Sequence, residues 1–201
     1  MSSWEGAHPE PPEDLDERKP LFVSGAGPWY RVHSADRSPL HFGTGARYRF
    51  DAPDGRYGVL YAADDAGGAF IETFGRHTGV RLVTRSELAR RGLARIRASR
   101  SLSLVDLAST GGLARVGADA RLVAGDRAVA RRWSAALHSL SPRPDGIRYP
   151  ARHDPAVAAV ALFDHVEADL GFDLLGSLAD RANETRLREL LERYGFGLLE
   201  G

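Results

Sequence analysis

One apolar segment, AVAAVALFD at residues 156–164, constrains the fold of this chain most strongly. A strand without alternating polar residues is buried on both faces of its sheet. GVLYAA, at residues 58–63, predicts a second strand of apolar character. The protein is therefore expected to contain a sheet whose central strands are covered by other structure.

The other segments predict helices and shorter strands. Helices are expected from a cap at Asp64 or Asp65 to about Gly75, within TRSELARRG (84–92), over 126–140, and from Asn183 to Gly195. Shorter strands are expected at WYRVH (29–33), PDGIRYP (144–150) and FGLL (196–199), with LARIRAS (93–99) and LSLVDLA (102–108) as a strand pair. Residues 34–57 predict a long loop that contains one strand piece, RYRF (47–50).

These elements show no clean alternation of strand and helix, which favours an α+β fold over a doubly wound sheet. We expect a single domain with a mixed, mainly antiparallel sheet flanked by helices. Two helix starts have specific local signals. Thr84 and Glu87 have the spacing of a capping box, and Asp126 is placed to cap the helix that follows it.

The length of 201 residues indicates one domain. Residues 1–20 are acidic and rich in proline, so we expect a flexible N-terminal arm followed by a folded domain at 21–201. The arm lacks the basic and then apolar pattern of a signal peptide, and no apolar run approaches the ~20 residues of a membrane span. The expected compartment is the cytoplasm.

Charge and cysteine content exclude several classes of function. Basic and acidic residues number 27 each, which gives no support for a nucleic-acid or anionic-membrane binder. The chain has no cysteine, so disulfides and thiolate metal sites are excluded. Lys19 is the one lysine, and the remaining basic residues are arginines, which bind phosphate oxygens well.

No common catalytic motif is present. GTG at residues 43–45 lacks the third glycine of a dinucleotide fingerprint, and there is no Walker or G-x-S-x-G sequence. The histidines are scattered without zinc-site spacing, so no metal is expected. Composition alone thus indicates a soluble α+β domain of unknown activity.

One carboxylate stands out from this background. Glu72 follows Tyr61 by eleven residues and has the apolar helical neighbours Ala69, Phe70 and Ile71. Glu72 either faces solvent on an ordinary amphipathic helix or lines a pocket together with Tyr61.

Four segments, in order along the chain, resemble the RES domain family: WYRVH, ARYRF, GVLYAADDAGGAFIETFG and DGIRYPARHDPAVAAVALFD. The resemblance covers roughly residues 28–165. It implies an ADP-ribosyltransferase-like fold and an enzyme that consumes NAD by phosphorolysis or hydrolysis. It also implies a toxin of a bacterial type II toxin–antitoxin system.

The resemblance assigns the family's arginine to Arg31, its tyrosine to Tyr61 and its glutamate to Glu72. Arg49 matches a second pocket arginine. The family's serine position is occupied by Ala151, either naturally or through a deliberate Ser→Ala change. Since a hydrogen bond to a charged group is worth roughly 1.5–3 kcal/mol, the missing hydroxyl implies a reaction slowed by about tenfold to a hundredfold.

Each residue has a chemical role and a structural alternative. Arg31, and then Arg49, can bind the pyrophosphate of NAD, or each can form a surface ion pair. Glu72 can hold the ribose hydroxyls and stabilise the positive charge of an oxocarbenium-like transition state. Tyr61 can stack on nicotinamide or hydrogen-bond near it, or it can simply pack in the core.

The resemblance implies NAD as the substrate, inorganic phosphate as a possible co-substrate, and an Xre-like antitoxin that occludes the active site within a hetero-oligomer. Balanced charge agrees with an antitoxin, not this chain, being the DNA binder. Two alternatives stay open: transfer of ADP-ribose to a protein target, and a weakened RES-like module that binds a nucleotide or protein without turnover.

Overall fold

The structure is a computed structural model that describes residues 8–77 and 79–200. The strands are β1 (Phe22–Gly25), β2 (Trp29–Ser34), β3 (Val59–Ala63), β4 (Leu82–Thr84), β5 (Arg91–Ala98), β6 (Leu102–Asp106), β7 (Gly146–Pro150), β8 (Ala158–Phe163), β9 (Leu170–Leu174) and β10 (Gly197–Leu199). The helices are α1 (Ala66–Phe74), α2 (Arg85–Ala89), α3 (Gly112–Val116), α4 (Arg121–Ala124), α5 (Arg127–His138) and α6 (Glu184–Tyr194), with 3₁₀ helices η1 (Asp164–Asp169) and η2 (Arg181–Asn183).

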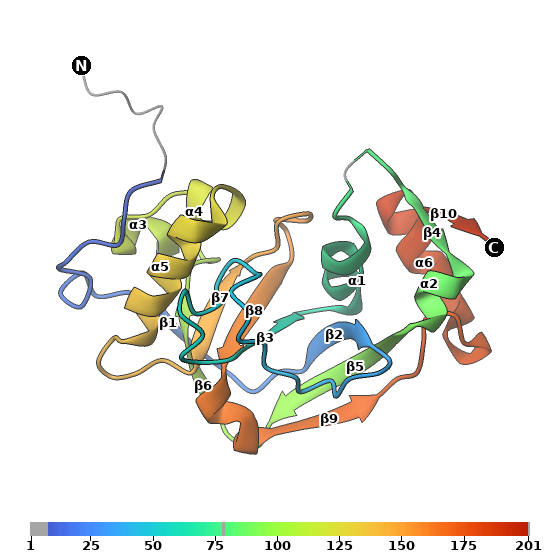
Figure 1. Cartoon of the computed structure of the whole chain (residues 1–201), viewed down its shortest axis with the longest axis horizontal. Helices are drawn as coiled ribbons and strands as arrows, with labels where there is room; N and C mark the ends of the chain where they lie inside the picture. The colour runs from blue at the N-terminus through green and yellow to red at the C-terminus, as the bar shows by residue number, and fades with distance from the viewer. Residues whose placement is uncertain (1–7, 78, 201) are drawn as a thin grey trace.

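The main sheet has eight strands in the order β1-β6-β7-β8-β3-β2-β5-β9. Its neighbours are antiparallel except β6 and β7, while β4 and β10 form a separate parallel pair. Helices α3, α4 and α5 gather beside β7, and α1, α2 and α6 gather at the opposite end of the molecule (Figure 1). The protein is thus a single α+β domain with a mixed, mainly antiparallel sheet, as the sequence predicts.

The hydrophobic core has three parts, and the central strands contribute to two of them. One face of β3, β7 and β8 packs with the fully buried Trp133 of α5. The other face of β3 and β8 forms a second cluster that also contains Ile96 of β5 and Leu104 of β6. Strands from both ends of the sheet share this cluster because the sheet curls. Side chains of α1 and α6, including Phe70 and Leu190, form the third.

The strong local signals of the sequence are confirmed. β8 is buried along its whole length. Asp65, not Asp64, caps α1 by accepting a hydrogen bond from the Gly68 amide at 2.6 Å. Thr84 and Glu87 form the complete capping box, and Asp126 caps α5.

Two strand predictions are wrong. RYRF (47–50) lies in a turn, because the amides of Arg47 and Tyr48 bond to the Asp51 carboxylate instead of to a neighbouring strand. β5 and β6 are strands but do not pair with each other: β5 lies between β2 and β9, and β6 lies between β1 and β7. The two strands lie near opposite ends of the curled sheet, so their side chains pack against each other in the second core cluster while their edges do not pair.

The predicted cap of the last helix also differs. Asn183 precedes α6 without a side-chain capping bond. Its side-chain nitrogen donates instead to the carbonyls of Leu175, at 2.7 Å, and Ser177, at 2.8 Å. The predicted end at Gly195 is confirmed, with glycine in the left-handed conformation. The final strand is present as β10, which pairs with β4.

Residues 8–20 pack against α5, where the sequence analysis expects a flexible arm; residues 1–7 lie outside the described residues. The Trp133 indole donates to the Pro9 carbonyl at 2.8 Å, and the His8 ring meets the indole edge-on. Leu15 is buried in the first core cluster. Apolar contacts and a buried indole bond therefore outweigh the polar composition of this segment. Within the described residues, no helix is long and apolar enough to cross a membrane.

Candidate active site

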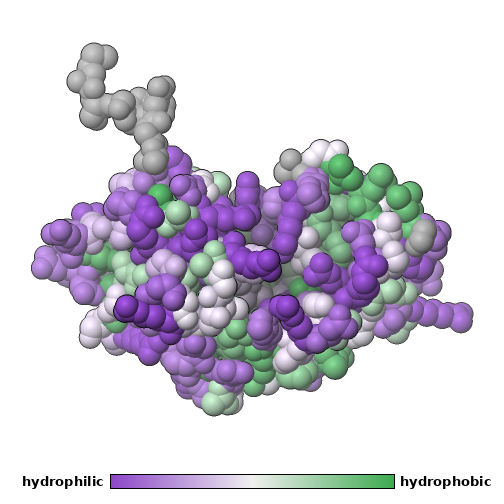
Figure 2. All heavy atoms as spheres, in the orientation of Figure 1, coloured by the Kyte–Doolittle hydropathy of each residue, from purple (hydrophilic) through white to green (hydrophobic). Residues whose placement is uncertain are grey.

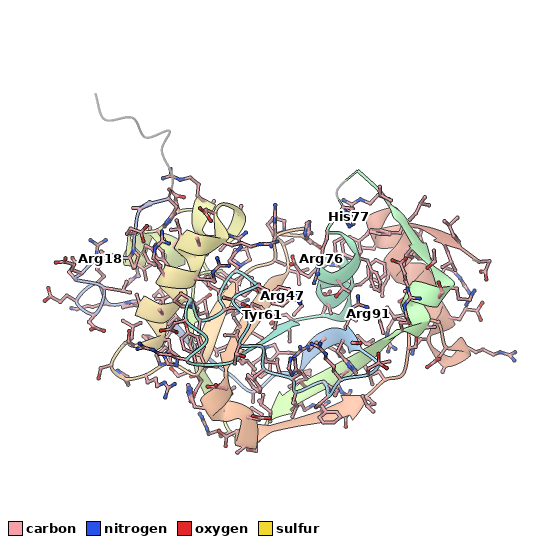
Figure 3. All side chains as sticks on the ribbon, viewed as in Figure 1. Arg18, Arg47, Tyr61, Arg76, His77 and Arg91 are labelled. Carbon is pink, nitrogen blue, oxygen red and sulfur yellow. The ribbon has the colours of Figure 1, made fainter. Side chains whose placement is uncertain are left out.

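The candidate site lies where the main sheet opens between two of its central strands. β2 and β3 are joined by one register pair, Tyr30 with Ala63. Arg31 follows that pair on β2, and Tyr61 precedes it on β3. Figure 2 shows a hollow in this region of the surface, rimmed by hydrophilic side chains. In Figure 3, Arg47, Tyr61 and Arg76 lie around it, and they come from the loop before β3, from β3 and from the end of α1.

Tyr61 is anchored through its hydroxyl. The hydroxyl donates to Asp51 Oδ1 at 2.8 Å and accepts from the Phe50 amide at 2.9 Å. The second oxygen, Asp51 Oδ2, accepts from the amides of Arg47 and Tyr48, each at 2.8 Å. Burial, and then the Asp51 charge, raise the pKa of Tyr61 well above its ordinary value. The hydroxyl therefore stays protonated and holds the preceding loop in place.

Asp51, which is 1% exposed, is not among the site residues predicted from the sequence. A short-range signal was present, since Asp side chains commonly bond backbone amides in turns. The other partner of the Asp51 carboxylate, the Tyr61 hydroxyl, lies on β3, ten residues away, so no local sequence pattern indicates this bond.

Tyr48 is a second residue that the sequence analysis missed. Its side chain is exposed, and its ring centroid lies 5.5 Å from that of Tyr61. The Arg76 guanidinium lies over the Tyr48 ring, 5.7 Å from the centroid. An exposed aromatic ring near a second ring and a cation can contact a planar ligand.

Arg31 does not form the surface ion pair that was its structural alternative. Its Nη1 donates to the carbonyls of Pro39, at 2.9 Å, and His41, at 3.1 Å. Burial lowers the pKa of Arg31 to about 10, partly opposed by the Tyr48 phenol. Arg31 has no carboxylate within salt-bridge distance among residues 8–77 and 79–200, so its positive charge stays uncompensated.

Arg49 is almost fully buried. Its Nη1 donates to the carbonyls of Leu122, at 3.2 Å, and Gly125, at 2.9 Å, at the end of α4. Burial, and then the positive charges of Arg152 and Arg127, lower the pKa of Arg49, whereas Glu72 raises it. Arg49 thus belongs to a group of like charges, and the carboxylate of Glu72 partly offsets their effect on its pKa.

Glu72 does not lie on a freely solvated helix face. Its Oε1 accepts a hydrogen bond from the His153 amide at 3.1 Å, in the loop between β7 and β8. Burial lowers the pKa of His153, and the Glu72 charge opposes this effect. Burial raises the pKa of Tyr149, and the Glu72 charge adds to this effect. The carboxylate therefore faces the loop that begins with Ala151.

Close packing of α1 places Glu72 there. A Cβ at Gly68 would lie 2.7 Å from Val157 Cγ1 and 2.8 Å from Ala63 Cβ. Only glycine allows α1 to approach β3 and the loop after β7 this closely.

Ala151 lies beside this site but does not open into it. The residue is 1% exposed, belongs to the first core cluster, and its amide donates to the Val157 carbonyl at 2.9 Å. A serine hydroxyl at this position would be enclosed by the protein, where it needs a hydrogen-bond partner.

Tyr61, Arg49 and Glu72 thus influence one another electrostatically. Glu72 and Arg49 both act on the pKa of Tyr149, and Asp51 acts on the pKa of both Tyr149 and Tyr61. Arg31 joins this group through Tyr48. Several arginines near the site have no salt bridge to a carboxylate within the described part of the chain: Arg47, Arg49, Arg76, Arg127 and Arg152. Most salt bridges lie elsewhere, so the site has an excess of positive charge suited to an anionic ligand.

Two other concavities lie away from these residues. A pocket of about 260 Å³ is lined by Trp29, Asp64 and Arg148, and a groove of about 400 Å³ runs along α6. In the first, Arg148 is neutralised by Asp64 and Asp106. Neither is lined by Arg31, Arg49 or Glu72, so we place the functional site at the opening between β2 and β3. Among residues 8–77 and 79–200, no group of three or more His, Asp or Glu residues is placed to hold a metal ion.

Comparisons with known proteins agree with this architecture. The family model described as the RES domain matches residues 28–173. The chain is similar in structure to a chain in the crystal structure of the M. tuberculosis MbcT-MbcA toxin-antitoxin complex, with a TM-score of 0.60, 21% sequence identity, and coverage of 87% of this chain and 96% of that chain. No sequence among the curated proteins matches. The structural likeness shows the fold, and the family match spans most of the sequence: this chain belongs to the RES domain family.

Proposed function

We propose that this chain is the toxin of a type II toxin–antitoxin pair and that it depletes NAD by cleaving the nicotinamide N-glycosidic bond. The observation that carries the proposal is the position of Glu72. Its carboxylate is fixed against the loop after β7, opposite a group of arginines without carboxylate partners. A carboxylate beside several cations matches a substrate with a positive nicotinamide ring and an anionic pyrophosphate.

The reaction needs an anion to stabilise positive charge on the ribose and cations to bind the negative pyrophosphate. As the glycosidic bond breaks, positive charge develops on the ribose, and a fixed carboxylate stabilises it. Glu72 is our candidate for that role. The arginines then hold the pyrophosphate, with Arg31 contributing a charge that no protein carboxylate neutralises in the described part of the chain. Tyr48 and Tyr61 offer aromatic surface for a planar ring.

The acceptor in this proposal is inorganic phosphate or water. The excess of positive charge supports phosphate, because it would concentrate a second anion near the ribose. Transfer of ADP-ribose to a protein is the alternative acceptor chemistry. The burial of Ala151 motivates a further alternative, a weakened module that binds a nucleotide or a protein without turnover.

The proposed partner is an antitoxin of the Xre-like class that covers the opening between β2 and β3. The similar M. tuberculosis chain belongs to a toxin–antitoxin complex, which supports a partner of this kind. An antitoxin that carries acidic side chains into the site would meet the unpaired arginines there.

The test is incubation of the purified protein with NAD, with and without phosphate, with nicotinamide release followed by chromatography. Glu72→Gln should reduce release by at least a hundredfold, because it removes the anion but keeps the side-chain shape. Glu189→Gln, on the exposed face of α6, is the matched control and should retain full activity. Release that is equal in both variants would reject the assigned role of Glu72. No release from the unmodified protein, with NAD still bound, would favour the binding module.

A further inference from the structure

Tyr149 carries a polar group at the site that neither the sequence motifs nor the proposed mechanism uses. It lies on β7, two residues before Ala151, with its ring packed against Phe50 at a centroid distance of 4.8 Å. The residue is 9% exposed and belongs to the same core cluster as Ala151. Its ring is thus held rigidly by the core.

The hydroxyl of Tyr149 makes no hydrogen bond to the described residues. In residues 8–77 and 79–200, His33 Nε2 is the one fully enclosed side-chain polar atom without a hydrogen-bond partner. The Tyr149 hydroxyl is therefore not fully enclosed. Buried hydroxyls nearly always have a hydrogen-bond partner. The Tyr149 hydroxyl therefore reaches an opening of the protein where a ligand or water can bond to it.

The geometry places this opening beside the candidate site. Tyr149 is in register with Ala159 of β8, which is in register with Ala63 of β3. The Phe50 ring that Tyr149 contacts belongs to the residue whose amide bonds to the Tyr61 hydroxyl.

The pKa of Tyr149 is raised far above its ordinary value by burial and then by the Glu72 charge, while Arg49 acts in the opposite direction. The hydroxyl thus remains a hydrogen-bond donor across the physiological pH range. The Tyr149 ring contacts Phe50, the residue that follows Arg49, and Glu72 is fixed against His153, four residues after Tyr149.

The Tyr149 hydroxyl lies close in sequence to the position where the family has a serine. Residue 151 is enclosed and carries only a methyl group, so it offers no polar atom to a substrate. Tyr149, two residues earlier on β7, belongs to the same core cluster and carries a hydroxyl.

We propose that the Tyr149 hydroxyl contacts the substrate and donates a hydrogen bond to an oxygen of the ribose held by Glu72, in place of the hydroxyl that is missing at position 151. The inference rests on the proposed function. It predicts that the chain is active despite Ala151.

The test uses four forms of the full chain: Tyr149→Phe, Ala151→Ser, the double variant, and Tyr57→Phe as a matched control. The Tyr57 hydroxyl is bonded to Ser134 inside the core, so its loss removes a buried hydroxyl away from the substrate. Nicotinamide release gives kcat and KM, calorimetry gives the Kd of NAD, and thermal unfolding reports the fold.

We expect Tyr149→Phe to lower kcat/KM by about tenfold to a hundredfold, with thermal stability close to that of the unmodified protein. Tyr57→Phe should lower stability and keep kcat/KM per folded molecule within about twofold. Because position 151 is enclosed, the serine hydroxyl of the double variant should not recover the lost activity. Recovery would show that residue 151, and not Tyr149, contacts the substrate, and would overturn the inference.

Unchanged kcat/KM in Tyr149→Phe would overturn the inference and leave the proposed function intact. If the unmodified protein binds NAD without turning it over, the proposed reaction fails, and the Kd decides the inference: a weakening of about tenfold in Tyr149→Phe supports the contact, and an unchanged Kd rejects it. A protein that neither binds nor cleaves NAD would reject both.

Discussion

The Tyr61 hydroxyl donates a 2.8 Å hydrogen bond to Asp51 Oδ1, and this bond joins a central strand to the loop that carries Arg47 and Tyr48. Asp51 is 1% exposed, so its carboxylate depends on these partners for stability inside the protein. The shape of one wall of the candidate site is therefore set by a contact between residues of two different elements.

Replacement of Tyr61 by phenylalanine should destabilise the protein by about 1–3 kcal/mol, because it leaves a buried carboxylate oxygen and the Phe50 amide without their partner. Urea unfolding monitored by circular dichroism measures the change. Asp51→Ala should be at least as costly, since it frees two more amides. The double variant should cost less than the sum of the two single changes; strict additivity would show that the bond contributes nothing.

Gly68→Ala should displace α1 from β3 and lower both stability and NAD cleavage. Its Cβ would meet Val157 and Ala63 at distances that require the helix to shift, at a cost of about 1–3 kcal/mol. Because α1 carries Glu72, the shift should also lower kcat. Gly171→Ala is the matched control, since a Cβ there meets nothing within 4 Å. Equal stability and equal activity in the two variants would contradict this account of how Glu72 is positioned.

The stability of the fold should decrease as the pH falls from about 6.5 to about 4, because burial, then Arg143 and His165, lower the pKa of His138 to about 4. In the unfolded chain a histidine has a pKa of about 6.5. In this window the unfolded state binds a proton that the native state does not, so acidification favours unfolding. Denaturant midpoints at pH 7 and pH 5 measure the effect.

A His138→Phe variant provides the control for that pH dependence. The His138 ring stacks on Tyr57 with centroids 3.9 Å apart, and phenylalanine preserves this contact without a titrating group. Its midpoint should fall less between pH 7 and pH 5 than that of the unmodified protein. A fall of the same size in both proteins would assign the pH dependence to other groups, such as His165, whose pKa burial also lowers.

Local interactions explain why part of this protein follows from its sequence. The apolar segment of β8, the caps at Asp65 and Asp126, and the capping box of Thr84 and Glu87 each depend on residues within a few positions of one another. Such signals are complete in the sequence, so these elements and the α+β class could be predicted. The RES domain membership likewise depends on segments that occur in order along the chain.

The tertiary structure decided everything that depends on distant partners. Curling of the sheet separates β5 from β6, although three residues join them. Asn183 bonds to loop carbonyls and does not cap α6. Asp51 joins its loop to β3 only because the Tyr61 hydroxyl lies within hydrogen-bond distance. The same packing encloses Ala151, just after β7, but does not fully enclose the Tyr149 hydroxyl two residues earlier, because burial depends on which distant segments pack over each residue.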